Sequence, residues 1–218
     1  MVKPEQASKR NRSMKNDREG QAAILTNADY SKIRSKIISR KYKLLFDLAW
    51  YTGERWGAIV KLRVADVYTQ DGTPREYINF RARTRKAKPK TPDKAKSTQK
   101  PKAKRSNRQV PVHPVLAELL SSYKPDPGVE WLFPCRTGDK PITLRWADDI
   151  LRSAVDKAGL SGKGVSTHST RRTFITNLAK NGINLAMIKK ITGHADLKVL
   201  SAYIEVSEDD MKNAIATL

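Results

Sequence analysis

The chain has 218 residues, a formal net charge of +21 and one cysteine, Cys135. A single cysteine excludes an intrachain disulfide and a cysteine-based zinc site, and a chain of this length buries a sizeable core without such cross-links. No apolar run approaches membrane-spanning length, and the N-terminus lacks the apolar core of a secretory signal. The charge predicts a polyanionic partner, with nucleic acid ahead of an anionic membrane surface or a merely solvated basic surface.

The first part of the chain predicts a tail followed by helices. Residues 1–24 are polar and poor in large apolar side chains, which favours a flexible basic tail. Thr26 and Asp29 have the spacing of a capping box, which begins a helix. Gly53 follows a strongly apolar helix and is expected to end it. We expect helices over three segments of this part: 26–37, 42–53 and the stretch that begins at Arg55.

Two segments in the middle of the chain have the character of β-strands. Residues 75–85 alternate apolar and polar side chains, and residues 107–114 supply a second strand, so that a hairpin is expected. Between them, residues 85–105 hold ten Lys or Arg and one acidic residue, a net charge of +9. Such a segment cannot bury a core, which predicts a disordered basic loop within the hairpin.

The remainder of the chain predicts helices. Asn181 and Gly193 are expected to end two of them, and the last carries Met211, Ile215 and Leu218 on one stripe. The predicted helices cover 114–123, 144–160, 168–181, 184–192, 196–205 and 207–218. The fold class is therefore mostly α with a small antiparallel β-hairpin, an α+β domain.

One segment near the C-terminus gathers residues that handle phosphate. His168 and Arg171 share a helix face, His194 follows in a turn, and Tyr203 comes nine residues later. The third histidine, His113, precedes a proline and receives no role. Arginine binds phosphate oxygens in pairs, histidine transfers protons near neutral pH, and tyrosine can attack as a nucleophile. The set suits phosphoryl transfer on a nucleic-acid backbone, and the lack of an Asp/Glu cluster favours a metal-free mechanism.

Each of these side chains alone has a structural alternative. A histidine beside an arginine is more often structural than catalytic. Tyr203 shares an apolar helical stripe with Val199 and Val206, which alone favours a core position. Arg171 and Arg172 alone indicate no more than a solvated face or a phosphate contact. The joint pattern is what favours the chemistry.

Three sequence boxes resemble those of the tyrosine recombinases, the phage integrase family. The family's two C-terminal boxes are similar to "HSTRRTF" and "TGHADLKVLSAY", and its Thr-Gly-x-Arg box is similar to "YTGERWGAIVKLRVADV". The predicted hairpin lies where the family carries a catalytic lysine. The resemblance covers residues 26–218 and implies the catalytic fold of a DNA breaking-rejoining enzyme.

The resemblance also implies a role for each residue. Tyr203 would attack the scissile phosphorus of double-stranded DNA and form a 3′-phosphotyrosyl link with a free 5′-hydroxyl. Arg55 and Arg171 would hold the non-bridging oxygens. His168 would take or return the tyrosine proton, and His194 would donate a hydrogen bond to the phosphate. Because the covalent link conserves the bond energy, the implied recombinase needs no ATP, and no metal or other cofactor is expected.

A lysine would protonate the leaving 5′-oxygen. Lys86 follows the first strand, where the family places this residue, and the basic loop offers four rivals, Lys88, Lys90, Lys102 and Lys104. Non-specific DNA contacts are expected from the same loop and from one helix: Arg172, Lys88, Lys90, Lys102, Lys104 and Arg105.

The resemblance implies a catalytic domain over 25–218 without the family's N-terminal core-binding domain, so the chain is either a fragment or a minimal recombinase. A tetramer on two duplexes is expected, with the last helix docked on a neighbouring protomer or packed on its own domain. The implied location is the cytoplasm, on the nucleoid, in a bacterial, phage or other mobile-element host. The alternatives are a non-catalytic DNA-binding protein of the same fold and a type IB topoisomerase or telomere resolvase. A basic RNA-binding or membrane-surface protein explains the charge but not the boxes.

Overall fold

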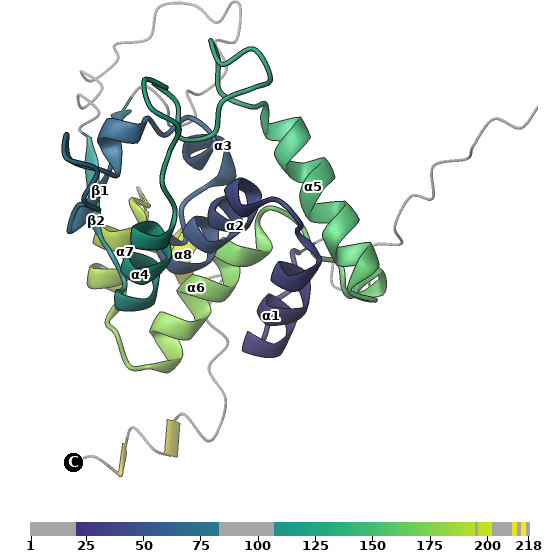
Figure 1. The fold of residues 1–218 in the computed structure, drawn as a ribbon. Coiled ribbons are helices and arrows are strands. Elements are labelled where there is room, and N and C mark those ends of the chain that lie inside the picture. The colour runs from purple at the N-terminus through teal and green to yellow at the C-terminus, as the bar shows by residue number, and fades with distance from the viewer. Residues whose placement is uncertain (1–20, 83–106, 195, 202–210, 213–214, 217–218) are drawn as a thin grey trace, which may run out of the picture.

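The structure of this chain is a computed structural model, which describes residues 21–82, 107–194, 196–201, 211–212 and 215–216. The described part is mostly helical, with one two-stranded antiparallel sheet at its left edge in Figure 1, which agrees with the predicted α+β class. The elements are α1 (Asn27–Lys36), α2 (Arg40–Thr52), α3 (Trp56–Ile59), η1 (Val64–Asp66), β1 (Tyr77–Phe80), β2 (Arg108–Pro111), α4 (Pro114–Ser122), α5 (Leu144–Lys157), η3 (Ser161–Lys163), α6 (Ser169–Lys180), α7 (Leu185–Thr192) and α8 (Leu197–Ser201).

Helix α2 lies at the centre of the fold. It packs against α6 and α4, while α1 packs against α5 (Figure 1). Most of its length is apolar, so that it is buried on several sides at once, as expected for a helix inside a core. The main core joins side chains of α2, the sheet and the following helices: Phe46, Leu48, Ile59, Ile78, Phe80, Leu116, Leu120 and Phe133.

The predicted capping box at the start of α1 is confirmed. The Asp29 N–H donates to Thr26 Oγ1 at 3.1 Å, and the Thr26 N–H donates to Asp29 Oδ2 at 2.8 Å. Two N–H groups that have no partner inside the helix are thereby satisfied.

A buried carboxylate fixes α1 onto α2. Asp47 is 1% exposed and accepts from the Tyr30 hydroxyl at 2.6 Å and from Arg34 Nε and Nη2 at 2.7 and 2.9 Å. Three charge-assisted hydrogen bonds offset the cost of burying the charge. This group belongs to the scaffold and lies apart from the residues that the sequence assigns to phosphate chemistry.

Contacts with the domain begin before residue 25, inside the segment predicted as a tail. Ala23 is fully buried, and its N–H donates to the Gly164 carbonyl at 3.2 Å. Arg172 Nη1 donates to the Ala22 carbonyl at 2.9 Å. These small residues have too little apolar surface to signal burial in the sequence, but the backbone contacts hold them on the domain. Residues 1–20 lie outside the described part.

The hairpin forms with shorter strands than the alternation predicts. β1 pairs with β2 so that Ile78 lies opposite Val110, and the alternate residues of β1 point into the core. β1 ends at Phe80, and the side chain of the next residue, Arg81, donates from Nε to the buried Asp66 at 2.8 Å. Residues 83–106, which include the predicted basic loop, lie outside the described part.

A second, smaller core joins the last three helices. Ile175 of α6, Ile188 of α7 and Leu200 of α8 are all fully buried and in contact. Helix α8 is described only to Ser201, so the remainder of the helix predicted over 196–205 lies beyond it. Of the described helices, none is long and apolar enough to cross a membrane.

The turn after α2 requires glycine for two reasons. Gly53 ends the helix with a φ of 57°, a left-handed conformation that side chains disfavour. The ring of Phe174 on α6 occupies the space that a β-carbon at this position would need. The helix end predicted at Gly53 is thus also a point of close helix packing.

We therefore expect Gly53→Ala to lower the free energy of unfolding by about 3 kcal/mol or more, since backbone strain and overpacking add. Gly72→Ala is the matched control, because Gly72 has a φ of 81° but open space around it. It should cost only about 1 kcal/mol. Urea denaturation of both variants measures the difference, and equal losses would contradict the packing argument.

Candidate active site

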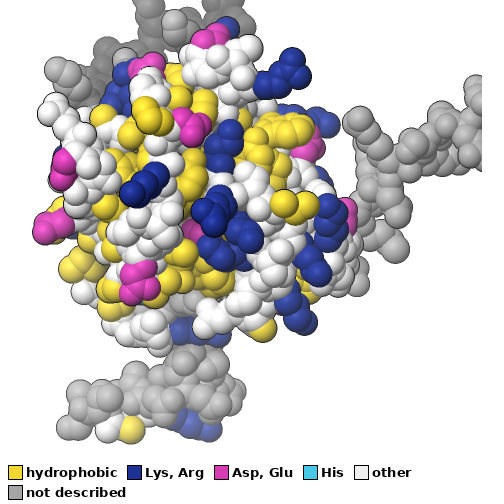
Figure 2. All heavy atoms as spheres, in the orientation of Figure 1, with side chains coloured by type: hydrophobic (Ala, Val, Ile, Leu, Met, Phe, Trp, Pro, Cys, Tyr) yellow, Lys and Arg dark blue, Asp and Glu magenta, His cyan; other side chains and the backbone are white. Residues whose placement is uncertain are grey.

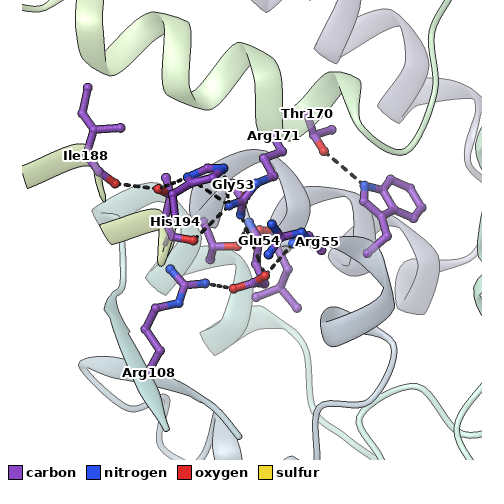
Figure 3. Close-up of polar contacts among 12 residues, drawn as sticks. Gly53, Glu54, Arg55, Arg108, Thr170, Arg171, Ile188 and His194 are labelled. Atoms are coloured by element: carbon purple, nitrogen blue, oxygen red, sulfur yellow. Dashed lines mark hydrogen bonds and ion pairs between the residues drawn. The ribbon is translucent and has the colours of Figure 1, made fainter. Parts of the chain in front are cut away.

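Three elements bring the predicted phosphate-handling residues together. Arg55 caps the N-terminus of α3 immediately after the Gly53 turn. His168 caps the N-terminus of α6, which places Arg171 in the first turn of that helix. His194 follows Gly193, whose φ of 67° ends α7. Residues far apart in the sequence thus meet where α2 and α7 end and α3 and α6 begin (Figure 3).

The Arg171 guanidinium is the centre of this arrangement. Its side chain is 4% exposed, and Nη1 donates to the Gly53 carbonyl at 2.9 Å. Nη2 donates to the Thr192 carbonyl at 3.0 Å and lies 3.1 Å from His194 Nε2. The two carbonyls belong to the ends of α2 and α7, which carry the partial negative charge of a helix C-terminus and attract a cation. One side chain therefore joins three helices (Figure 3).

A pocket of about 290 Å³ opens beside Arg171. Arg55, which is half-buried, and His168, which is exposed, share its wall with the exposed Lys61. The remaining lining residues are Glu54, Trp56, Gly57, Ala58, Leu144, Thr167 and Arg171. Several cationic or proton-transferring groups and a partly apolar wall make it suited to a phosphate diester.

Helices α3 and α6 are tied together at the edge of this pocket. The Trp56 indole Nε1–H donates to Thr170 Oγ1 at 3.1 Å, and both side chains are buried. The bond fixes the start of α3 against the start of α6. Because Arg55 and His168 cap those two helices, it also sets their separation across the pocket.

His194 is held in one neutral form. The Thr192 hydroxyl donates to the Ile188 carbonyl at 2.6 Å, so at 2.7 Å it accepts from the Nδ1–H of His194. The lone pair then lies on Nε2, which faces Arg171. Burial lowers the pKa of His194 to about 4, and the positive charges of Arg171, Arg55 and Arg108 act in the same direction.

Two residues next to the pocket, Glu54 and Arg108, were not predicted from the sequence. Glu54 is 1% exposed, and its carboxylate pairs with Arg108 of β2 and lies 3.9 Å from Arg171 Nη1. Arg108 is 8% exposed and lines a second pocket with His194. For Glu54, the signal in the sequence was an acidic residue directly before the arginine of the Thr-Gly-x-Arg box.

The other predicted site residues have different outcomes. Arg172 is buried and donates to the Ala22 carbonyl, so it faces the protein interior and not the solvent. Those outside the described residues are Tyr203, Lys86, Lys88, Lys90, Lys102, Lys104 and Arg105.

His113, which received no role, caps α4 by accepting the Val115 N–H at 3.2 Å and stacks on Tyr51. In the described part of the chain, no three His, Cys, Asp or Glu residues gather as metal ligands.

Comparison with known proteins decides the family. The sequence profile of the phage integrase family matches residues 18–210. The chain belongs to this family. Tyrosine recombinase XerD of Caulobacter vibrioides is 32% identical over 87 residues, which are 40% of this chain and 28% of that protein. Transposase A from transposon Tn554 of Staphylococcus aureus is 25% identical over 201 residues, 88% of this chain and 51% of that protein.

The fold agrees with this membership. The Tn1549 transposon integrase, solved in complex with a circular intermediate DNA, is 19% identical and has a TM-score of 0.67. That match covers 93% of this chain and 67% of the integrase. At this identity the likeness shows the fold alone. The chain spans about a quarter to a half of the length of the curated relatives, with 28% of the recombinase and 51% of the transposase covered.

The low pKa of His194 predicts a pH-dependent stability. Its ordinary value is 6.5 and its value in the folded chain is about 4, so between these values the unfolded state binds more protons. The contribution of neutral His194 to the free energy of unfolding is therefore present above pH 6.5, and it is lost as the pH falls towards 4. The His194 contribution should fall by about 2 kcal/mol between pH 7 and pH 5.

Urea denaturation at the two pH values checks this expectation. His194→Asn should lose most of that pH dependence, because asparagine has no titrating group. His113→Asn, which keeps a helix-capping acceptor, should retain it. An unaltered pH dependence in His194→Asn would contradict the assignment.

Proposed function

We propose that the chain is a site-specific recombinase or integrase that cleaves and rejoins double-stranded DNA through a 3′-phosphotyrosine intermediate. One observation carries this proposal. Arg55, His168 and Arg171, which come from two separate sequence boxes, line one pocket of about 290 Å³. Side chains that serve only as core or surface have no reason to converge on one cavity with this combination of chemistry.

In the proposed reaction, the Tyr203 oxygen attacks the phosphorus and its proton passes to His168, whose exposed position leaves room for the nucleophile. Arg55 and Arg171 bind the two non-bridging oxygens and stabilise the charge of the transition state. The bond to the 5′-oxygen breaks, and Lys86 supplies the proton that this oxygen takes. Rejoining is the same sequence in reverse, with the 5′-hydroxyl of either strand as the nucleophile.

His194 needs a different tautomer to take part. In the arrangement described above, its N–H points to Thr192 and its lone pair to Arg171. A hydrogen bond from His194 to the phosphate requires the proton on Nε2 and a displacement of the Arg171 donor. We propose that phosphate binding drives this exchange, because the incoming anion takes over the Arg171 N–H group.

Double-stranded DNA is the proposed partner. Figure 2 shows Lys and Arg side chains gathered at the centre and along the α5 side of one face, with Asp and Glu scattered around them. The exposed Lys61 at the pocket wall suits a phosphate next to the scissile one. The lysines proposed for non-specific phosphate contacts are Lys88, Lys90, Lys102 and Lys104, together with Arg105. The Tn1549 integrase, solved with DNA, supports this choice.

Self-association on the DNA is proposed as well, as a tetramer that holds two duplexes. Met211 and Ile215, at 55% and 70% exposure, present apolar surface that could contact a neighbouring protomer.

The proposed location is the nucleoid of a bacterial host, in keeping with the bacterial sources of the matched proteins. The alternative functions are DNA binding without cleavage and a topoisomerase-type relaxation of single duplexes.

Covalent trapping tests the proposed activity. On a suicide duplex, nicked so that the short cleaved fragment diffuses away, wild-type protein should form an adduct that survives a denaturing gel. Tyr203→Phe should form none, because phenylalanine lacks the attacking oxygen. Tyr77→Phe is the matched control at a tyrosine that is 49% exposed on β1, and it should react as wild type does. An adduct in Tyr203→Phe would exclude this tyrosine as the nucleophile.

A sulfur-substituted substrate tests which lysine protonates the leaving group. Lys86→Ala should slow cleavage of ordinary DNA by about 100-fold or more, within the range of general acid catalysis. When sulfur replaces the bridging 5′-oxygen, the rate should return close to the wild-type value, because a thiolate leaves without a proton. The same comparison on Lys88, Lys90, Lys102 and Lys104 should show no such rescue. Rescue at one of these positions, and not at Lys86, would reassign the role.

A further inference from the structure

Glu54 is a buried anion at a place where the proposed reaction needs positive charge. A carboxylate next to a phosphate-binding arginine repels the substrate and weakens the arginine's attraction for it. Burying a charged carboxylate also carries a large desolvation cost unless it is paired and hydrogen-bonded. A group with both disadvantages calls for a specific role.

The contacts of Glu54 reach three arginines. Oε1 accepts from the backbone N–H of Arg55 at 2.8 Å and lies 3.9 Å from Arg171 Nη1. Oε2 pairs with Arg108 Nη2 of β2. Figure 3 shows the carboxylate between the Arg108 side chain on one side and Arg55 and Arg171 on the other.

The pair with Arg108 alone accounts for only part of this arrangement. Arg108 is 8% exposed, and among the described residues its Nε and Nη1 have no hydrogen-bond partner. The buried Arg108 guanidinium therefore depends on Glu54 for compensation. However, the second oxygen of Glu54 serves the other two arginines, and a counter-ion for Arg108 would not need it to do so.

We propose that Glu54 is a positioning residue of the reaction, which sets the two phosphate-binding arginines against each other. Through the Arg55 N–H it fixes the start of α3, from which the Arg55 side chain enters the pocket. Through its charge it holds the Arg171 guanidinium in the orientation given by the Gly53 and Thr192 carbonyls. Three guanidinium groups and one carboxylate leave two positive charges, which match the charge of a phosphorane-like transition state.

This inference rests on the proposed function and predicts a separation between DNA binding and cleavage. Glu54→Gln keeps the shape and an acceptor for the Arg55 N–H but removes the negative charge. DNA affinity should stay equal or rise, since the site gains positive charge. The cleavage rate on the suicide duplex should fall on the order of 100-fold, because the arginines lose their alignment. A purely structural residue would lower both in proportion to the folded fraction.

Asp47→Asn is the matched control. Asp47 is also 1% exposed and also pairs with an arginine, but it lies between α1 and α2, away from the pocket. Both variants lose a buried carboxylate of equal exposure. Measured at a temperature where both are folded by circular dichroism, Asp47→Asn should cleave at the wild-type rate.

The double variant Glu54→Gln with Arg108→Gln separates the proposal from simple charge compensation. If Glu54 positions Arg55 and Arg171, the double variant should stay as slow as Glu54→Gln. A return to the wild-type rate would mean that Glu54 only compensates Arg108 and would overturn the proposal. Wild-type cleavage by Glu54→Gln itself would overturn it too.

If wild-type protein forms no adduct, the proposed function is refuted but the role of Glu54 is not. A measurement that does not depend on activity then tests the role of Glu54. The Arg171 Nε–H resonance should be sharp in the nuclear magnetic resonance spectra of wild type and Asp47→Asn, because the guanidinium is immobilised. It should broaden or shift in Glu54→Gln. An unchanged Arg171 resonance in Glu54→Gln would show that the Glu54 carboxylate does not fix the Arg171 guanidinium, and would overturn the proposal.

Discussion

The buried guanidinium of Arg171 is the constraint on which the rest of the site depends. It donates to carbonyls at the ends of α2 and α7 while its own backbone belongs to the first turn of α6. These bonds can form only when the three helices meet at fixed angles, so the main core and the smaller core around Ile175 must both be in place. The scaffold is therefore built to hold this cation out of water, where its attraction for an anion is strongest.

Burying several positive charges close together destabilises the fold, and two neighbouring side chains, His194 and Glu54, reduce this electrostatic cost. His194 stays neutral because burial and the neighbouring arginines lower its pKa to about 4, so it adds no fourth charge near pH 7. Glu54 offsets one of the three guanidinium charges; it lies against the guanidinium groups of Arg108 and Arg171 and accepts from the backbone N–H of Arg55. The remaining net positive charge suits a phosphate in the proposed reaction, and it is small enough that the buried site does not destabilise the fold.

Local sequence patterns predicted the elements well, whereas contacts between distant residues were beyond them. The Thr26–Asp29 capping box and the alternation of Ile78 and Phe80 are properties of neighbouring residues, so spacing alone revealed them. The resemblance of the boxes indicated that Arg55, His168 and Arg171 act together. Nothing local indicated that Glu54 would meet Arg108 from a strand more than fifty residues away, or that Arg172 would turn inward to Ala22.

The proposed chemistry is tested most directly by locating the atom of the protein to which the DNA is attached. We would digest the trapped adduct with nuclease and trypsin and identify the modified peptide by mass spectrometry. A nucleotide 3′-phosphate is expected on the peptide that contains Tyr203, with a free 5′-hydroxyl on the released strand. Attachment to a different residue, or through a 5′-phosphate, would contradict the proposed chemistry and the roles given to the arginines around it.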